Sequence, residues 1–273
     1  MSVYRSEKPT NLLRALQSVW DDQTLKPSQI VLVKDGPLGE ALDSVISAWI
    51  ERLPHIMCVL TNDQNMGLTK SLNKGLKVVT GDFIARMDSD DISMPRRFER
   101  QIEFLTNHPK IAVCGGWLQE FDEADSCLNI RHYPDNPTLI RKYICKASPL
   151  AHPTVMFRKS VFSDNGFVYN EKYRTSQDLA LWFDILDAGL NISNLQEVTI
   201  RFRRDIDVFK RRSRKKAMNE FKIYMNGIYR LHGIFTWRYI YPISRLIFRY
   251  LPLPIIKNIY GSGIRKKILE KQN

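Results

Sequence analysis

Over the first two thirds of the chain, short apolar runs alternate with segments whose apolar residues recur every three or four positions. Residues 30–33 (IVLV) are typical of a buried strand, and a Lys-Asp-Gly-Pro turn follows them. In residues 67–79, four apolar side chains share one face of a helix. The same patterns predict strands at 30–33, 57–60, 83–87 and 111–114, and helices at 11–20, 42–53, 67–79 and 98–105.

Strands and helices that alternate with short connections are typical of an α/β protein with a mainly parallel sheet and flanking helices. Ligands of such sheets bind beyond the carboxyl ends of the strands. Asp35 and the acidic run that begins at Asp88 each follow a predicted strand. These positions are therefore the first candidates for a binding site.

The amino terminus departs from this pattern. An α/β unit of this kind begins with a full buried strand, whereas residues 2–4 (SVY) provide only a short one before the first helix. Either Met1 corresponds to an internal methionine of a longer chain, or the first strand is unusually short. We favour the first interpretation.

Composition limits the class of protein. The chain has 273 residues, 44% of them hydrophobic and 26% charged, so it can bury a sizeable core, and disorder is not expected. The four cysteines are widely spaced and form no C-x-x-C pair, which favours reduced thiols over a zinc site or a disulfide scaffold.

The start lacks a signal-peptide pattern. Prolines and arginines interrupt the apolar stretch 239–260, so we expect no membrane-spanning helix.

Positive charge is concentrated near the end of the chain. The formal net charge is +12, but residues 201–273 hold 19 Lys and Arg against 4 Asp and Glu, while residues 1–200 hold 22 against 25. A near-neutral body with a basic tail indicates that the body carries the activity and that the tail binds a partner or a surface. Apolar residues such as Leu246, Phe248 and Ile255 lie among the basic ones, an arrangement suited to an anionic membrane surface. No recognisable nucleic-acid-binding module accompanies them.

The strongest local signal is the run 86–91 (RMDSDD), which follows a predicted strand. Its three carboxylates repel one another unless a cation lies among them. Mg²⁺ and Mn²⁺ are hard ions that take oxygen ligands and bridge phosphates. An acidic turn that caps the next helix is an equally good interpretation of this run alone.

Four weaker motifs each have a structural alternative. Asp35 can accept a hydrogen bond from a base or a sugar hydroxyl, but it also fits a plain turn. Residues 65–75 (NMGLTKSLNKG) can present the free N–H groups of a helix start to a phosphate. Asp178 stands in the first turn of a helix, where the helix dipole stabilises its anion and where it could act as a general base. His152 is a lone histidine, a residue that is more often structural than catalytic.

Taken in order, five segments resemble the inverting glycosyltransferases of family 2. They are PSQIVLVKDG, NMGLTKSLNKG, GDFIARMDSDDISMPRRFERQ, AHPTVMFRKSVF and SQDLALWFDIL. They are most similar to the bacterial branch that assembles O-antigen and capsular or exopolysaccharide repeat units. The resemblance covers residues 1–205 and implies the GT-A fold, with a nucleotide-binding part near 1–115 and an acceptor-binding part near 116–205. Residues 206–273 then form a basic, amphipathic, helical extension that associates with a membrane.

The resemblance also implies roles for single residues. Asp35 matches the carboxylate that contacts uracil. Asp88, Asp90 and Asp91 match the D-x-D region, which binds the ribose and, through Mn²⁺ or Mg²⁺, the diphosphate. In this assignment Asp88 and Asp90 bind the nucleotide, and Asp90 and Asp91 bind the metal. Asp178 matches the catalytic base.

Five further residues within these motifs are candidates for substrate binding: Lys70, Arg86, His152, Gln177 and Trp182. Two positions depart from the family pattern. Lys34 stands where many relatives have Asp, and Gln177 stands where Glu is common before the base. Neither change removes a carboxylate that has been given a role.

The activity implied by the resemblance is transfer of a hexose, with UDP-glucose or UDP-galactose favoured as the donor. The acceptor is a hydroxyl of a lipid-diphosphate-linked sugar, such as GlcNAc-diphospho-undecaprenol, at the cytoplasmic face of the bacterial inner membrane. Inversion converts an α-linked donor into a β-linked product. Two alternatives remain open: a relative that binds nucleotide sugars without catalysis, and a protein whose basic tail binds nucleic acid.

Overall fold

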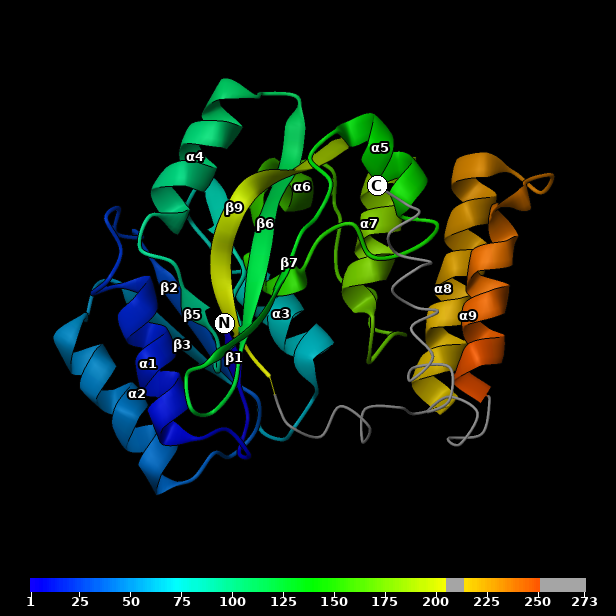
Figure 1. Ribbon diagram of the computed structural model, residues 1–273. Helices are drawn as coiled ribbons and strands as arrows, with labels where there is room; N and C mark the ends of the chain where they lie inside the picture. The colour runs from blue at the N-terminus through cyan, green and yellow to red at the C-terminus, as the bar shows by residue number, and fades with distance from the viewer. Residues whose placement is uncertain (205–213, 251–273) are drawn as a thin grey trace. The chain divides into compact units, whose positions relative to one another are not determined.

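The computed structural model describes residues 1–204 and 214–250, which belong to two compact units, Met1–Ile206 and Asp207–Asn273. In the first unit the predicted succession of strands and helices is confirmed (Figure 1). The segments that match the expected ones are α1 (Pro9–Val19), β2 (Ile30–Lys34), α2 (Glu40–Arg52), β3 (Met57–Thr61), α3 (Leu68–Leu76), β4 (Phe83–Ala85), α4 (Arg97–Asn107) and β6 (Ile111–Phe121).

The strands of this unit form two sheets. In the first, β1 (Ser2–Val3), β2 and β3 are parallel. The second has the order β4–β8–β6–β9–β5, with β7 paired to β6. Its further strands are β5 (Ile92–Ser93), β7 (Cys127–Arg131), β8 (Met156–Arg158) and β9 (Asn191–Arg203).

The α/β class is confirmed, while the pairing in the second sheet is mixed. The long strands β6 and β9 run parallel, and the other pairs of this sheet are antiparallel. The turn between β6 and β7 shows one reason, because a short connection can join only antiparallel strands. In that turn the carboxylate of Asp122 accepts hydrogen bonds from the N–H groups of Ala124 and Ser126.

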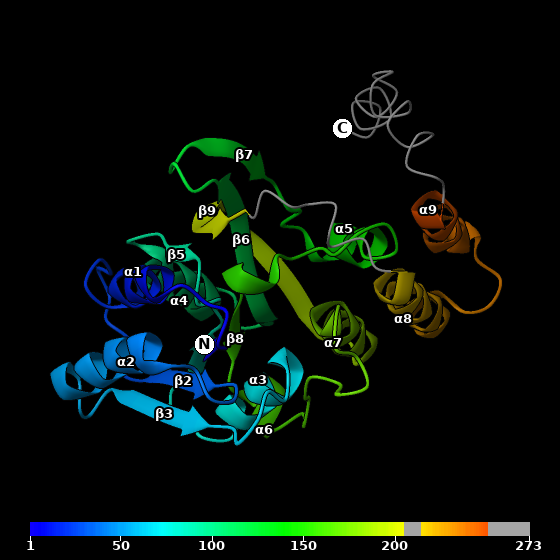
Figure 2. The ribbon, with the colours of Figure 1, turned by 90° about the horizontal axis from the view of Figure 1, so that it is seen from below.

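Helices cover both faces of the second sheet. Helices α4 and α7 (Gln177–Asp187) lie on opposite sides of β6 and β9 in both views (Figure 1, Figure 2), and both contact β9. Helix α5 (Pro137–Tyr143) also contacts β9, whereas α3 packs against β1 and β2. One apolar cluster includes Leu32 of the first sheet and Ile111 and Ile200 of the second, and it therefore joins the two sheets into one body.

The second unit contains a pair of helices, α8 (Arg214–His232) and α9 (Ile240–Tyr250), connected through a short 3₁₀ helix (Trp237–Tyr239). Arg245 of α9 donates a hydrogen bond of 3.1 Å to the hydroxyl of Tyr224 in α8, and Arg249 pairs with Glu220 at 3.6 Å. No helix among the described residues has the length and apolar character that a membrane span requires. Residues 251–260 of the interrupted apolar stretch lie outside the described residues.

Candidate functional site

The acidic run 88–91 lies in the loop between β4 and β5, and strand β9 fixes its end. The backbone N–H of Arg203 donates to the Asp91 carboxylate at 3.0 Å, and Nε of the same arginine donates to the backbone carbonyl of Asp90 at 3.1 Å. At the start of the loop, the N–H of Arg86 donates to the carbonyl of Val155 at 2.9 Å. The N-cap of the following helix is Arg96, so the acidic run does not cap that helix.

The three carboxylates of this loop converge. Asp88, Asp90 and Asp91 each offer one oxygen, and these oxygens lie within 4.8 Å of one another. Asp91 has no exposed surface, and its Oδ2 atom has no hydrogen-bond partner within the described part of the chain. A buried, unpaired carboxylate oxygen is costly, and oxygen ligands at this separation suit a hard divalent cation. The residues present therefore fit such an ion.

Burial and mutual repulsion shift the acidity of this cluster. Burial raises the pKa of Asp90 to about 7, with further contributions from the charges of Asp88 and Glu7. The pKa of Asp91 is raised well above its usual range by burial first and then by Asp88 and Asp90. A cation bound among these groups would favour their ionised forms.

Arg86 and Asp88 form an ion pair at the edge of the cluster. Both outer nitrogens of the Arg86 guanidinium donate to the Asp88 carboxylate. The Arg86 side chain is 6% exposed, against 28% for Asp88. The guanidinium, which was expected to bind substrate, is thus held by a carboxylate of its own loop.

A second arginine lies beneath the loop. Arg97 of α4 is 2% exposed and donates to the carbonyls of Arg86 (2.8 Å) and Val155 (3.2 Å). Its Nε donates to Gln101, whose amide in turn donates to the carbonyls of Cys114 and Thr154. Burial, followed by the charge of Arg86, lowers the pKa of Arg97 to about 9. This network fastens the acidic loop to α4 and β6.

Asp35 stands at the end of β2, where it organises the loop before α3. Its carboxylate accepts hydrogen bonds from the N–H groups of Met66 (2.8 Å) and Gly67 (2.9 Å) and from the Asn62 side chain (3.0 Å). The sequence analysis suggested that N–H groups near this helix start could bind a phosphate. Two of them instead donate to Asp35. Gly36 follows in a left-handed conformation, where a Cβ would lie 2.7 Å from the nitrogen of Asn65.

Helix α3 carries Lys70 on an exposed position and holds the chain segment that leads to α7. The side-chain amide of Asn73 donates to the carbonyl of Tyr169 at 2.8 Å and accepts from its N–H at 3.0 Å. Thr69 donates to the carbonyl of Tyr173 at 2.9 Å. The segment 65–75 thus has a positioning role that the sequence alone did not indicate.

Asp178 lies in the first turn of α7 and is half-buried, as the sequence predicts for its position on the helix. The helix is preceded by Ser176, whose φ of 62° is left-handed and uncommon for a residue other than glycine. Gln177, beside Asp178, is buried. Backbone strain of this kind is concentrated at functional sites, where the surrounding structure maintains it.

His152 and Trp182 lie in the core behind this site. His152 Nε2 is 2.8 Å from the hydroxyl of Tyr169, and its ring packs edge-on against Trp182. Burial, followed by the charge of Arg86, holds the pKa of His152 well below its usual range. Trp182 has no exposed surface, so the direct substrate contact expected for it does not fit its position. Both residues support α7 from inside the protein.

Tyr169 lies close enough to both the acidic loop and Asp178 for their charges to act on it. Its hydroxyl is buried, which raises its pKa, and the charges of Arg86, Asp178 and Asp88 all act on it. Tyr169, Glu7 and Arg203 are contributors that sequence reasoning missed. Glu7 accepts a hydrogen bond from Ser89 at 3.0 Å. These residues are remote in sequence from the acidic run, and no local motif marks them.

Comparison with known proteins matches residues 1–166 to the family model "Glycosyl transferase family 2". The chain is 33% identical over 261 residues to the amylovoran biosynthesis glycosyltransferase AmsE of Erwinia amylovora, an alignment that covers 95% of this chain and 96% of that protein. It is 32% identical over 268 residues to an Escherichia coli UDP-Gal:alpha-D-GlcNAc-diphosphoundecaprenol beta-1,3-galactosyltransferase, with 97% of this chain and 95% of that one covered.

Solved structures confirm the fold. The UDP complex of Staphylococcus aureus TarS residues 1–349 superposes with a TM-score of 0.62 at 17% identity, covering 90% of this chain and 68% of that one. The mannosyltransferase PcManGT of Pyrobaculum calidifontis, in complex with GDP-Man and Mn²⁺, gives 0.61 at 13% identity, covering 96% and 78%. The expected GT-A fold is therefore confirmed.

Neutralising single carboxylates should change the stability of the metal-free protein in opposite directions. Asp91→Asn keeps an acceptor for the Arg203 N–H and removes a buried negative charge, so we expect thermal unfolding in EDTA to occur a few degrees higher. Asp88→Asn leaves Arg86 buried without its partner, so unfolding should occur at a lower temperature. The gain in Asp91→Asn should shrink as the pH falls and vanish below about 4, where the parent carboxyl is protonated in both the folded and the unfolded chain. An Asp91→Asn variant no more stable than the parent at pH 8 contradicts this account.

Proposed function

Because the chain belongs to glycosyl transferase family 2, we propose that it transfers a hexose, with inversion, from a UDP-sugar to a lipid-diphosphate-linked sugar. The chain is a glycosyltransferase related to enzymes of bacterial polysaccharide synthesis. The convergence of Asp88, Asp90 and Asp91 is the observation that carries the proposal, since a nucleoside diphosphate needs a site that can hold its charge. The near full-length similarity to the E. coli galactosyltransferase supports UDP-galactose, with UDP-glucose as the other favoured donor, and GlcNAc-diphospho-undecaprenol as the acceptor.

In this proposal the donor lies between the loop that follows β2 and the acidic loop that follows β4. Asp35 recognises the uracil through lone pairs left by its bonds to Met66, Gly67 and Asn62. Asp88 and Asp90 bind the nucleotide. Asp90 and Asp91 would hold Mn²⁺ or Mg²⁺, which when bound supplies Lewis-acid stabilisation of the charge that develops on the diphosphate.

Asp178 acts as the general base. Its place in the first turn of α7 favours the anionic form, because the amino end of a helix carries partial positive charge. The carboxylate takes the proton of the acceptor hydroxyl while the oxygen attacks the anomeric carbon opposite UDP. A new carbon–oxygen bond forms, the bond to the diphosphate oxygen breaks, and UDP leaves with the electron pair. An α-linked donor therefore gives a β-linked product.

The second unit brings the enzyme to its lipid-linked acceptor at the cytoplasmic face of the inner membrane. Phe235 is 99% exposed, and Ile234, Trp237, Ile240 and Ile247 are each at least 59% exposed. Arginines at 230, 238, 245 and 249 lie in the same unit. Apolar and aromatic side chains flanked by arginine suit an anionic lipid surface, and each basic residue near it contributes about 1 kcal/mol.

A panel of UDP-sugars tests the donor and the metal together. With Mn²⁺ and a synthetic GlcNAc-diphospho-lipid, we expect the product mass to increase by one hexose, and NMR of the product should show a β-linkage. EDTA should abolish transfer, and added Mn²⁺ should restore it, because the buried carboxylates need a cation. Undiminished transfer in EDTA would remove the metal from the proposal. Binding of UDP without transfer of any sugar would indicate the non-catalytic alternative.

Replacing Asp178 by Asn tests the base. The variant keeps the shape and loses the charge, so turnover should fall by about 10²–10⁴-fold while UDP affinity changes little. Asp184→Asn in the same helix is the matched control and should remain near the parent rate. Near-normal turnover of Asp178→Asn would contradict the assignment of Asp178 as the base.

Vesicle sedimentation tests the membrane surface. The full chain should co-sediment with vesicles containing phosphatidylglycerol, less so at high salt, since charge attraction is screened over roughly 8 Å at physiological ionic strength. The double substitution Phe235→Ser and Trp237→Ser should reduce the bound fraction, whereas Leu139→Ser, at a residue 53% exposed in the first unit, should not. Equal binding of both variants would show that the exposed aromatic residues do not contact lipid.

A further inference from the structure

Asp35, which the proposed function places against the uracil, accepts hydrogen bonds from three donors of the protein. Its Oδ1 atom receives two of them, from the N–H of Met66 at 2.8 Å and from the Asn62 amide at 3.0 Å. Its Oδ2 atom receives one, from the N–H of Gly67 at 2.9 Å. A carboxylate has about two lone pairs on each oxygen, so Oδ2 keeps one and Oδ1 keeps none. Oδ2 is therefore the atom of Asp35 that is left to accept from a ligand.

The orientation of the Asn62 amide is fixed by Lys74 of α3. The ammonium group of Lys74 donates to Asn62 Oδ1 at 3.1 Å and to the carbonyl of Thr61 at 2.6 Å. Because an ammonium group can only donate, the Asn62 atom that faces it is the oxygen. The NH₂ group is then left for Asp35 and for Ser71 Oγ, each at 3.0 Å. Lys74 thus determines that Asp35 meets a donor.

These hydrogen bonds are built into the interior of the first unit. Asp35 is 5% exposed, Asn62 is 7% exposed, and Ser71 has no exposed surface. The backbone N–H of Asn62 donates to the carbonyl of Lys34 at 2.9 Å, which holds the residue beside the end of β2. The Asn62 side chain is therefore fixed at both its backbone and its amide.

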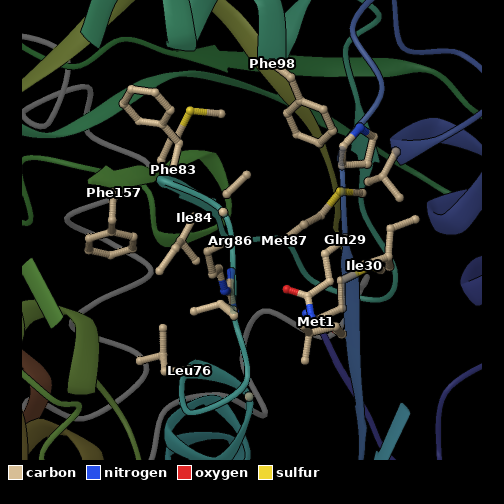
Figure 3. Close-up of a pocket in the computed structure, with 18 of the residues that line it drawn as sticks. Met1, Gln29, Ile30, Leu76, Phe83, Ile84, Arg86, Met87, Phe98 and Phe157 are labelled. Atoms are coloured by element: carbon tan, nitrogen blue, oxygen red, sulfur yellow. Dashed lines mark hydrogen bonds between the residues drawn. The ribbon is translucent and has the colours of Figure 1, made fainter. Parts of the chain in front are cut away.

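Helix α3 turns its apolar face away from Lys74. On that face, Leu72 and Leu76 line a cavity of about 390 Å³ together with residues of β2 and β4 (Figure 3). Most of the lining is apolar, and Lys74 is not part of it. The ammonium group of Lys74 is instead directed to the polar atoms of Thr61 and Asn62.

We propose that Lys74 and Asn62 are positioning residues that make Asp35 select a pyrimidine with a ring N–H, such as uracil, over one with a bare ring nitrogen, such as cytosine. The inference rests on the proposed nucleotide site at Asp35. The ring N–H of uracil donates to the lone pair left on Oδ2. Cytosine presents a lone pair at the same ring position, so two acceptors would face each other without a hydrogen bond.

The donor from Asn62 is what restricts Asp35 to accepting. Asn62→Asp keeps the shape of the side chain and replaces the NH₂ group by an oxygen, which places two carboxyl groups within hydrogen-bond distance of each other. Carboxylates that share a site hold a proton between them. A protonated Asp35 can donate, and it can then bond to the bare ring nitrogen of cytosine.

Titration calorimetry of the full-length protein with UDP and with CDP, both in Mn²⁺, tests the two positioning residues. The parent should bind UDP about 10²-fold more tightly than CDP, or more, because the mismatched base leaves buried acceptors unpaired. Asn62→Asp should reduce this preference about tenfold or more. Lys74→Met frees the amide to turn and should reduce the preference by a smaller factor. Lys77→Met, at an exposed lysine that ends the same helix, is the matched control and should keep the preference of the parent.

The ratio of the two affinities separates positioning from a general loss of structure. A merely structural role would weaken UDP and CDP equally, and unchanged ratios in both variants would overturn the inference while leaving the proposed function in place. A parent that binds neither nucleotide would contradict the proposed function itself. Thermal unfolding shows whether each variant folds. Should Asn62→Asp fail to fold, Lys74→Met at its half-buried position decides the outcome.

Discussion

The rest of the structure depends on one electrostatic constraint, the presence of three carboxylates in a largely buried loop. Asp91 has no exposed surface, and the charges of Asp88 and Asp90 act on it. The protein surrounds the loop with donors, namely the guanidinium of Arg86 on Asp88, the backbone of Arg203 on Asp91, and Arg97 on the loop backbone. These donors come from the loop itself, from β9 and from α4, so the fold of the second sheet brings them together.

The charge of Arg86 also acts on His152 and Tyr169 in the core behind α7. Burial, followed by the charge of Arg86, lowers the pKa of His152, whose ring lies 2.8 Å from the hydroxyl of Tyr169 and packs against Trp182. Because Trp182 belongs to α7, this core contact helps to fix the helix that carries Asp178. Arg86, His152 and Tyr169 therefore lie between the acidic loop and the helix that carries Asp178.

Local features of the fold and site were predictable from the sequence, and long-range ones were not. The apolar run 30–33 and the periodic apolar residues of 67–79 are local patterns that predict burial, so the bounds of β2 and α3 were predicted to within a few residues. The antiparallel pairing of β4 with β8 joins residues far apart in the chain, and no local pattern records it. Trp182 was expected near substrate because its motif contains Asp178, but α7 buries residues around most of its circumference, which leaves Trp182 in the core.

The residue before the proposed base shows how burial refines a motif. Gln177 is 5% exposed and stands where the resemblance described in the sequence analysis implies that Glu is common. A carboxylate at this buried position would repel the anion of Asp178, and each would raise the pKa of the other. The neutral amide avoids this repulsion and leaves Asp178 as the single carboxylate of the first turn of α7.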